Sequence, residues 1–434
     1  MAIELHPKCK TRLIEVLTKG LPKIRAKNGM FIDRLSVISI VAVDSVLPES
    51  GRVREQLDYV DELPLTQFVV ETLDMELWEL DKFDGDRPLV NLFDIQGYSD
   101  ATAVATRLLD SFQTLPWQYQ LTFTLPDEIK MLLEPELYEF RLGPNIRLAR
   151  PGKTFKERFP LDSGNARRNQ DIEGSPLLFY DASKPPTWKV DALYLQVQVD
   201  GFVGQDGGSQ TTVRAERLIR AFGGLGIALG LFVHRHKYIH GAARKTHYYV
   251  HRRNADGKWK PENRLEADDA TDRGLRGLEL SSPDGHLKTD AAKAAWVKAR
   301  LQDLAVAFSS GPKAEPLLLA AQWLFDSYAG RDELLSFVQA MIVLEILLGD
   351  KNIAEEIGLG ALLRNRLAYM IGSSYRDRTE LLEDFSSIYR VRSQIVHTGK
   401  HRLSSEERRL FLKLRWMCLR VMAKELELLK GDHQ

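Results

Sequence analysis

The chain has 434 residues, more than one hydrophobic core usually serves, so we expect two or three domains. Its 44% hydrophobic and 28% charged residues are those of an ordinary globular protein, not of a disordered or fibrous one. Sixty basic residues balance sixty acidic ones, so no net field draws the protein toward nucleic acid, and a polyanion would have to bind to a local patch.

Cysteine usage and hydropathy indicate the compartment. Cys9 and Cys418 lie far apart and fit neither a metal nor a disulfide spacing, which indicates reducing surroundings. The first ten residues carry charges where a secretory signal would need an apolar stretch. The longest apolar run, residues 221–233, is shorter than the roughly 18–20 residues that span a bilayer. We therefore expect a cytoplasmic protein without membrane contact.

Alternating apolar and polar residues predict strands in the first three hundred residues. Residues 117–125 and 193–199 alternate strictly, which is typical of strands with one face toward a core. Residues 136–142 and 146–149 flank a Gly-Pro-Asn turn and predict a hairpin. The N-terminal region is therefore expected to be mixed α/β with antiparallel strands.

Helices are expected among these strands. Ser99 or Asp100 is positioned to cap a helix before the first strand. Residues 212–232 carry one apolar stripe and predict an amphipathic helix, although four glycines weaken it. A further helix is expected at 291–308.

Composition suggests how the chain is divided. Residues 254–285 are polar and lack periodicity, so we expect a long loop there. Ser309-Ser-Gly-Pro312 marks the expected domain boundary. The N-terminal region would then cover residues 1–310, with a possible division into two subdomains at the proline-containing loop near 183–190.

Residues 311–434 predict an all-helical C-terminal domain. Periodic apolar residues predict five helices with short links, which favours an up-down bundle. Ser404-Ser-Glu-Glu407 matches a capping box at the start of the last helix. The predicted fold class is thus α+β, a mixed α/β region followed by a helical bundle. The five expected helices cover 315–328, 332–348, 354–371, 377–397 and 404–429.

Arg392 is the first residue that a plain bundle does not explain. With about 100° per residue, the helix at 377–397 places Arg392 in the middle of its apolar stripe. A guanidinium there is costly unless it is paired or faces a polar cleft. The expected apolar stripe consists of Leu381, Phe385, Ile388, Ile395 and Val396.

A polar edge leads from this arginine to the end of the helix. Tyr389 and Ser393 lie along it, and His397 follows on the last turn. Gly399 is a natural residue to end the helix. His397 is therefore expected to be exposed enough to exchange protons.

Glu345 is the second such residue, because it is the only charge in the apolar stretch 337–348. A buried carboxylate needs a partner, and Arg392, Arg364 and Arg366 are candidates. A structural explanation remains open. Buried Arg–Glu pairs often serve only the fold, and a histidine near a helix C-terminus can simply favour the helix dipole.

The motif Arg392-x4-His397, within residues 389–399, resembles the RX4-6H signature of the HEPN superfamily. The resemblance extends over roughly residues 315–430 and is greatest to the Apea-like HEPN branch of prokaryotic defence proteins. The other residues that carry it are Leu344-Glu345, the segment Leu363-Arg-Asn-Arg-Leu367 and the long final helix.

The resemblance implies a metal-independent ribonuclease without a cofactor. In this family two HEPN domains pair so that their arginines and histidines converge, and one signature per chain implies a homodimer. His397 would transfer protons at the ribose 2′-OH or the leaving 5′-oxygen, and Arg392 would clamp the phosphate. Glu345, Tyr389 and Ser393 would support them. The expected products carry a 2′,3′-cyclic phosphate and a 5′-hydroxyl, and DNA should survive.

The same resemblance implies a role in antiphage defence by abortive infection. The N-terminal region would sense a phage-derived or nucleic-acid trigger, or restrain the nuclease. Two other functions remain open: a non-catalytic HEPN module for dimerisation or partner docking, and a nucleic-acid-binding regulator.

The regulator would use residues 232–253, which contain five histidines and no acidic residue. Interleaved tyrosines could stack on bases while the cations hold phosphates. A β-hairpin with a solvated basic edge is the simpler interpretation, and a zinc site is less favoured because no cysteine is near. The candidate RNA contacts are Arg235, Lys237, Arg244, Lys245, Arg252 and Arg253.

Overall fold

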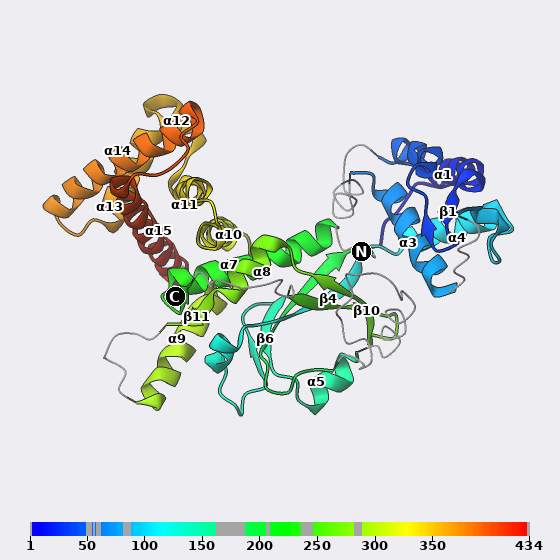
Figure 1. The fold of residues 1–434 in the computed structure, drawn as a ribbon, viewed down its shortest axis with the longest axis horizontal. Coiled ribbons are helices and arrows are strands. Elements are labelled where there is room, and N and C mark those ends of the chain that lie inside the picture. The colour runs from blue at the N-terminus through cyan, green and yellow to red at the C-terminus, as the bar shows by residue number, and fades with distance from the viewer. Residues whose placement is uncertain are drawn as a thin grey trace. The chain divides into compact units, whose positions relative to one another are not determined.

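The computed structural model divides into two compact units, each formed from several stretches of chain (Figure 1). The residues that the structure describes are 2–48, 54, 57, 62–80, 88–161, 187–204, 209–235, 246–281 and 289–431. The first unit contains Met1–Gln120, Gln198–Ala215 and Val250–Leu265. The second contains Leu121–Val197, Glu216–Tyr249 and Glu266–Gln434.

Helices around a small antiparallel sheet build the N-terminal part of the first unit. Its core includes Leu17, Phe68 and Phe112. Asp100 caps α4 by accepting from the backbone N–H of Thr102 and Ala103, which confirms the predicted helix. The helices are α1 (Pro7–Gly20), η1 (Leu21–Lys23), η2 (Ser36–Ser39), η3 (Val41–Val46), α3 (Pro64–Leu80), η4 (Leu92–Asp94) and α4 (Ala101–Gln113). The sheet has the order β2-β1-β3, with β1 (Arg25–Lys27), β2 (Phe31–Ile32) and β3 (Leu89–Asn91).

A six-stranded sheet has the order β10-β9-β4-β7-β6-β5. The predicted strands at 117–125 and 193–199 are confirmed as β4 and β7, and the predicted hairpin as the antiparallel pair β5 and β6. The strands are β4 (Trp117–Thr124), β5 (Glu139–Arg141), β6 (Ile146–Ala149), β7 (Tyr194–Gly201), β9 (His247–Arg253) and β10 (Trp259–Glu266). The short helices η5 (Asp127–Leu132) and α5 (Lys153–Arg158) follow β4 and β6. Residues 183–186 of the loop expected at 183–190 lie outside the described residues.

The prediction of a long loop at 254–285 is wrong for the described part of this range, residues 254–281. This stretch forms β10, α8 (Asp269–Arg276) and β11 (Leu278–Leu280). β10 is a half-buried strand at the edge of the sheet, so its side chains need no apolar alternation. The start of α8 is fixed by its cap, since Asp268 accepts from the N–H groups of Ala270 and Thr271.

The basic segment at 232–253 does not form one hairpin. Its first part, β8 (Phe232–His234), pairs with β11 in a separate two-stranded sheet, while β9 belongs to the six-stranded sheet. The helix expected at 212–232 is α7 (Gln210–Ala228), which ends before Gly230 adopts a φ of 71°. The chain therefore changes from helix to strand sooner than the apolar run suggests.

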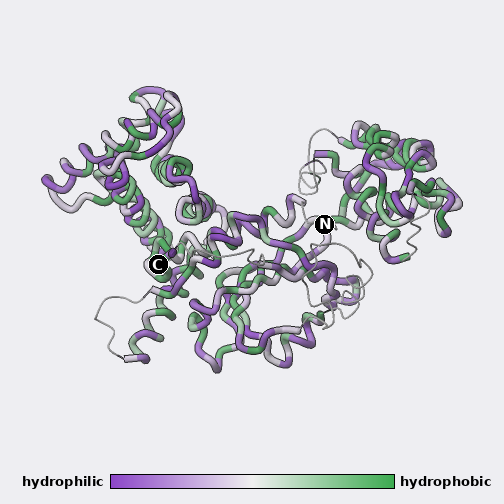
Figure 2. The backbone as a smooth tube through the Cα atoms, viewed as in Figure 1, coloured by the Kyte–Doolittle hydropathy of each residue, from purple (hydrophilic) through white to green (hydrophobic). Residues whose placement is uncertain are grey.

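The C-terminal part of the second unit is all-helical, which confirms the α+β fold class. Figure 2 shows hydrophobic and hydrophilic residues alternating along these helices, as expected when each buries one face. The helix expected at 354–371 is broken at Gly358, whose φ of 84° separates α12 from α13. The helices are α9 (Asp290–Ser309), η6 (Gly311–Ala314), α10 (Glu315–Ala329), α11 (Glu333–Leu348), α12 (Lys351–Ile357), α13 (Leu359–Ile371), α14 (Tyr375–Thr398) and α15 (Ser405–Gly431).

The boundary expected at 309–312 falls within the second unit, where η6 links α9 to α10, and it stays a prediction. Within the described ranges, no helix combines the length and hydropathy needed to cross a bilayer.

Helix α10 packs closely on α7 and α8, and we call this contact the α7–α8–α10 junction. A Cβ atom added at Gly224 would overlap the backbone carbonyl of Ala321. The ring of Phe325 occupies the space that side chains at Gly223 and Gly274 would need. Three glycines therefore allow close packing, which explains the presence of Gly223 and Gly224 in the amphipathic helix α7 and of Gly274 in α8.

Candidate active site on helices α11 and α14

Both ends of α14 are fixed by local interactions. The Ser374 hydroxyl accepts from the N–H of Asp377 at 3.2 Å and caps the start. Gly399 ends the helix with φ 66° and ψ 39°, the left-handed conformation expected for it. His397 therefore lies on the last turn, and its side chain is exposed as predicted.

The buried face of α14 differs in part from the expected stripe. Leu381, Phe385, Ile388 and Val391 are buried, whereas Val396 is 47% exposed. At about 100° per residue, the observed face is centred roughly 55° from Phe385 toward Val391, so Val396 lies about 75° from its centre. Burial of Val396 was thus predicted wrongly, and Ile395 is only half-buried.

Arg392 lies against α11 and pairs with Glu345. Its Nη2 lies 3.4 Å from Oε1 of Glu345, and the two side chains are 23% and 22% exposed. Of the three candidate partners for Glu345, the structure thus selects Arg392. Arg366 instead donates to the carbonyl of Leu348 at 3.0 Å and lies 3.4 Å from Asp350.

The contact between Arg392 and Glu345 is an ion pair but not a hydrogen bond. Nε of Arg392 and Oε1 of Glu345 are both buried, and neither has a hydrogen-bond partner within the described part of the chain. A buried donor without a partner costs about 1–3 kcal/mol, so such a group needs an explanation. The guanidinium is therefore incompletely satisfied, and an anion could approach it only through the 23% of the side chain that is exposed.

His397 follows Arg392 by five residues on the same helix. This separation corresponds to about 140° around the helix and about 7.5 Å along its axis. Among the described residues, no hydrogen bond or ion pair joins the two side chains or engages the imidazole of His397. One chain therefore presents a half-buried cation and an exposed imidazole without locking them together.

Tyr389 and Ser393 are half-buried on the edge between these residues. The ring of Tyr389 stacks on Phe385, with centroids 6.2 Å apart. It also covers Gly360 at the start of α13, where an added Cβ would lie 3.0 Å from the ring. Tyr389 thus has a packing role, and direct support of Arg392 by either side chain stays a prediction.

The described cations of the basic segment are engaged within the protein. Arg235 pairs with Glu279 at 3.1 Å. Arg252 pairs with Glu262 at 3.3 Å and lies over the ring of Trp117, 4.3 Å from its centroid. Arg253 donates to Gln118 at 3.0 Å. These contacts favour a structural role over an open RNA-binding row. Lys237, Arg244 and Lys245 lie outside the described residues.

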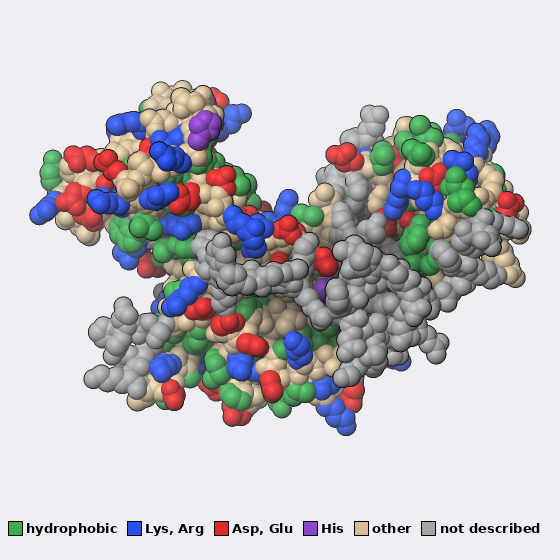
Figure 3. All heavy atoms as spheres, in the orientation of Figure 1, with side chains coloured by type: hydrophobic (Ala, Val, Ile, Leu, Met, Phe, Trp, Pro, Cys, Tyr) green, Lys and Arg blue, Asp and Glu red, His purple; other side chains and the backbone are tan. Residues whose placement is uncertain are grey.

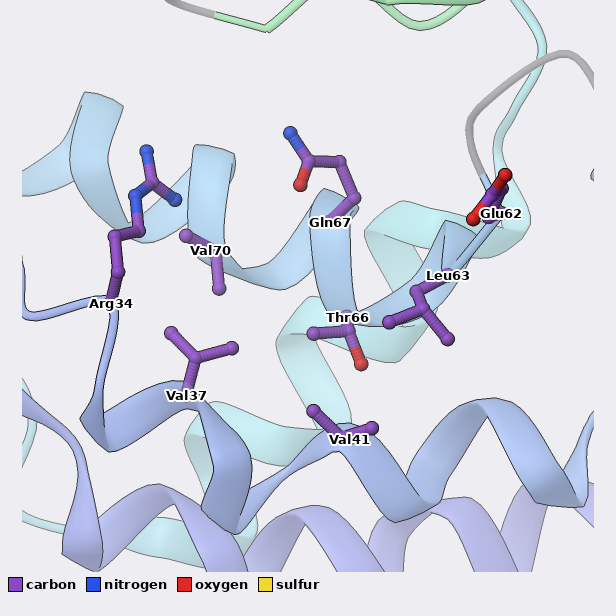
Figure 4. A pocket seen from close by; sticks show the side chains of 8 residues that line it. All are labelled: Arg34, Val37, Val41, Glu62, Leu63, Thr66, Gln67 and Val70. Carbon is purple, nitrogen blue, oxygen red and sulfur yellow. The ribbon is translucent and has the colours of Figure 1, made fainter.

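A cavity of about 250 Å³ in the first unit had no signal in the sequence (Figure 4). It lies among η2, η3 and α3, with Val37, Val41 and Thr66 in its wall and the polar ends of Arg34 and Gln67 at its rim. Its lining holds no nucleophile–base pair. Over the ranges that the structure describes, no group of three or more His, Cys, Asp or Glu side chains is placed to hold a metal ion.

Three kinds of comparison bear on the relationship of the chain to known proteins. No protein-family model, no curated protein and no solved structure matches it. The resemblance to the HEPN superfamily therefore stays a prediction from the sequence.

Proposed function

We propose that this protein is a metal-independent endoribonuclease of the HEPN type that acts as a cytoplasmic homodimer. The observation that carries the proposal is the state of Arg392. Its guanidinium lies on a largely apolar face, makes one 3.4 Å contact to Glu345 and keeps a buried Nε without a partner in the described structure. A phosphate oxygen would supply the acceptor that this arginine lacks.

The proposed chemistry needs one base and one acid. The neutral imidazole of His397 takes the proton from a ribose 2′-OH, and the 2′-oxygen attacks the adjacent phosphorus. The bond from phosphorus to the 5′-oxygen breaks, and that oxygen takes a proton from the imidazolium of the second protomer's His397. Arg392 offsets the charge that builds on the phosphate oxygens. The products are a 2′,3′-cyclic phosphate and a 5′-hydroxyl.

A homodimer follows from this requirement, because each chain offers one imidazole and one guanidinium from the motif. Two copies that meet at the C-terminal end of α14 would bring two imidazoles and two guanidinium groups to one phosphodiester. In this proposal the enzyme serves antiphage defence by abortive infection, and the N-terminal region holds it inactive until a phage-derived or nucleic-acid trigger binds.

The test is cleavage of labelled single-stranded RNA by the purified full-length protein in excess EDTA. His397→Ala should lower the rate by about 10²–10⁴ and Arg392→Ala by about 10²–10³. Arg376→Ala is the matched control, since Arg376 is an exposed arginine on the same helix, paired with Glu380 at 3.0 Å. A substrate with a 2′-deoxy group at the cut site should remain intact. Equal cleavage by wild type and His397→Ala would rule the proposal out.

A nuclease that awaits its trigger calls for a second readout. Growth arrest on expression in cells should be relieved by His397→Ala and not by Arg376→Ala. The proposal would be contradicted if the wild type and His397→Ala were equally toxic. It would also be contradicted if the wild type caused no growth arrest under phage challenge.

The contact between Arg392 and Glu345 also favours a second candidate, a non-catalytic helical module in which the pair serves the fold. That module would show no cleavage and would lose stability without Arg392. RNA binding without cleavage, abolished in Arg252→Ala and Arg253→Ala, would instead support the RNA-binding regulator.

A further inference from the structure

The loop between α14 and α15, residues 399–404, is held at both ends. Lys400 Nζ lies 2.7 Å from Glu407 Oε1 and 3.5 Å from Gln394 Oε1, so one side chain connects the loop to both helices. Leu403 is only 2% exposed and anchors the middle of the loop. The shape of this loop is therefore set before any ligand arrives.

The predicted capping box completes the attachment. The N–H of Ser404 donates to Glu407 Oε2 at 2.7 Å, and the N–H of Glu407 donates to the Ser404 hydroxyl at 3.2 Å. Burial acts to raise the pKa of Glu407, but the hydrogen bonds from Lys400 and Ser404 outweigh it and lower the pKa. The carboxylate is therefore ionised and is occupied by Lys400.

Two other polar side chains of the loop make no such contact. His401 and Arg402 are exposed, and neither has a hydrogen-bond or ion-pair partner among the described residues. No acidic residue occurs between Gly399 and Ser405. Figure 3 shows that, on the face drawn, Lys and Arg side chains lie among Asp and Glu side chains over the helical part of the second unit. The loop thus presents the guanidinium of Arg402 and the imidazole of His401 on a backbone that Lys400, Leu403 and Glu407 hold in place.

His401 and Arg402 follow His397 closely in the chain. His401 is four residues and Arg402 five residues beyond it, across the left-handed turn at Gly399. Five residues of chain reach about 17 Å at most, and the turn shortens that distance. The chain therefore limits the distance between His397 and these two residues to that span.

We propose that His401 and Arg402 form a phosphate subsite that holds an RNA strand beside His397. The proposal rests on the proposed nuclease function for its substrate. Arg402 offers a bidentate fork to a phosphate, and His401 adds a donor to the same backbone. Such contacts position the strand and do not read its sequence, so the subsite contributes to affinity and not to base preference.

The experiment measures KM, kcat and binding for the full-length protein with single-stranded RNA. The double variant His401→Ala/Arg402→Ala should raise KM by on the order of tenfold and leave kcat within about twofold of wild type. The slope of log affinity against log salt should become shallower by about 0.7 for each phosphate that the variant no longer holds. Arg376→Ala should change neither quantity. Since His401 and Arg402 are exposed, the variant should keep the wild-type melting temperature.

Anisotropy of a fluorescein-labelled single-stranded RNA separates the two proposals. Wild-type cleavage with unchanged KM and salt slope in the double variant overturns the subsite and leaves the nuclease standing. Binding that is weakened in the double variant, together with no cleavage by wild type, overturns the nuclease and supports the subsite. Absence of RNA binding by wild type overturns the subsite.

Discussion

Arg220 and Arg392 both lie on half-buried helix faces of the second unit, but they differ in how many polar partners the guanidinium has. Arg220, in the α7–α8–α10 junction, donates from Nε to the Thr271 hydroxyl at 2.8 Å and pairs through its other nitrogens with Asp268 and Asp326. Arg392 has one ion-pair contact, at 3.4 Å, and a buried Nε without a partner in the described chain. The first guanidinium is saturated and the second is not.

The packing is also more rigid near Arg220 than near Arg392. At the junction, Gly224 faces the backbone carbonyl of Ala321, which cannot move without shifting α10. Near Arg392, Gly360 faces the side chain of Tyr389, which can rotate. The comparison indicates that saturated charges with rigid packing maintain the fold, while spare donors beside adaptable packing are available for a ligand.

The largest difference in the free energy of unfolding should appear when the two arginines are replaced separately by alanine. Arg220→Ala leaves two partly buried carboxylates without their counter-charge, and should lower the free energy of unfolding by about 2–4 kcal/mol, somewhat less than for a fully buried pair. Arg392→Ala leaves one partly buried carboxylate, Glu345, without its cation, but it breaks a single 3.4 Å contact and removes an unsatisfied donor, so the loss should be smaller, about 1 kcal/mol. Urea denaturation measures both. Equal decreases would mean that Arg392 is structural, and would favour the non-catalytic module.

The next effect should come from adding a methyl group at each glycine. Gly224→Ala forces two backbones apart and should cost about 1–3 kcal/mol or more. Gly360→Ala presses on a movable ring, and the helix propensity of alanine offsets part of the strain, so the change should stay within about 1 kcal/mol. Thermal melting of the two variants tests this. A Gly360→Ala variant as unstable as Gly224→Ala would show that the packing near Arg392 is rigid as well.

The smallest effect should appear in the pH dependence of stability. Burial, with a contribution from Asp268, raises the pKa of Glu216 to about 8. Burial likewise raises the pKa of Asp326 to about 6. A raised carboxyl pKa means that the folded protein holds a proton that the unfolded chain releases, so the associated stability is lost as pH rises from about 5 to 8.

Glu216→Gln should flatten this dependence, because the amide mimics the protonated acid. The slope that disappears should be at most the roughly 1.4 kcal/mol per pH unit of one full proton. Melting temperatures of both proteins between pH 5.5 and 8 provide the measurement, with Glu425→Gln as a comparison in which burial without a second carboxylate raises the pKa. Parallel curves for wild type and Glu216→Gln would contradict the assignment.

Much of the fold could be predicted from hydrophobic periodicity and caps. Periodicity identified β4, β7 and the C-terminal helices, and Asp100, Ser404 and Gly399 marked helix ends correctly. It failed at residues 254–281, because a polar edge strand and a short capped helix show no apolar repeat.

The site was predictable only in part. A charge on an apolar helix stripe can be recognised in the sequence, and Arg392 and Glu345 were predicted as site residues on this basis. The choice of partner among three arginines, and the saturation of Arg220, depend on contacts between helices far apart in the chain. The exposure of Val396 depended on the exact rotation of α14, which a rule of 100° per residue leaves open by tens of degrees.

The burial of α10 against α7 and α8 determines where the helical part can be cut from the rest of the chain. Its Ala321 and Phe325 are fully buried, with α7 and α8 providing part of their cover through Gly224 and Gly274. A fragment that starts at residue 311 would lack that cover and expose an apolar ridge, together with Asp326 stripped of Arg220. Truncation at the compositional boundary would therefore yield an aggregation-prone product, and a severable module would have to retain both α7 and α8.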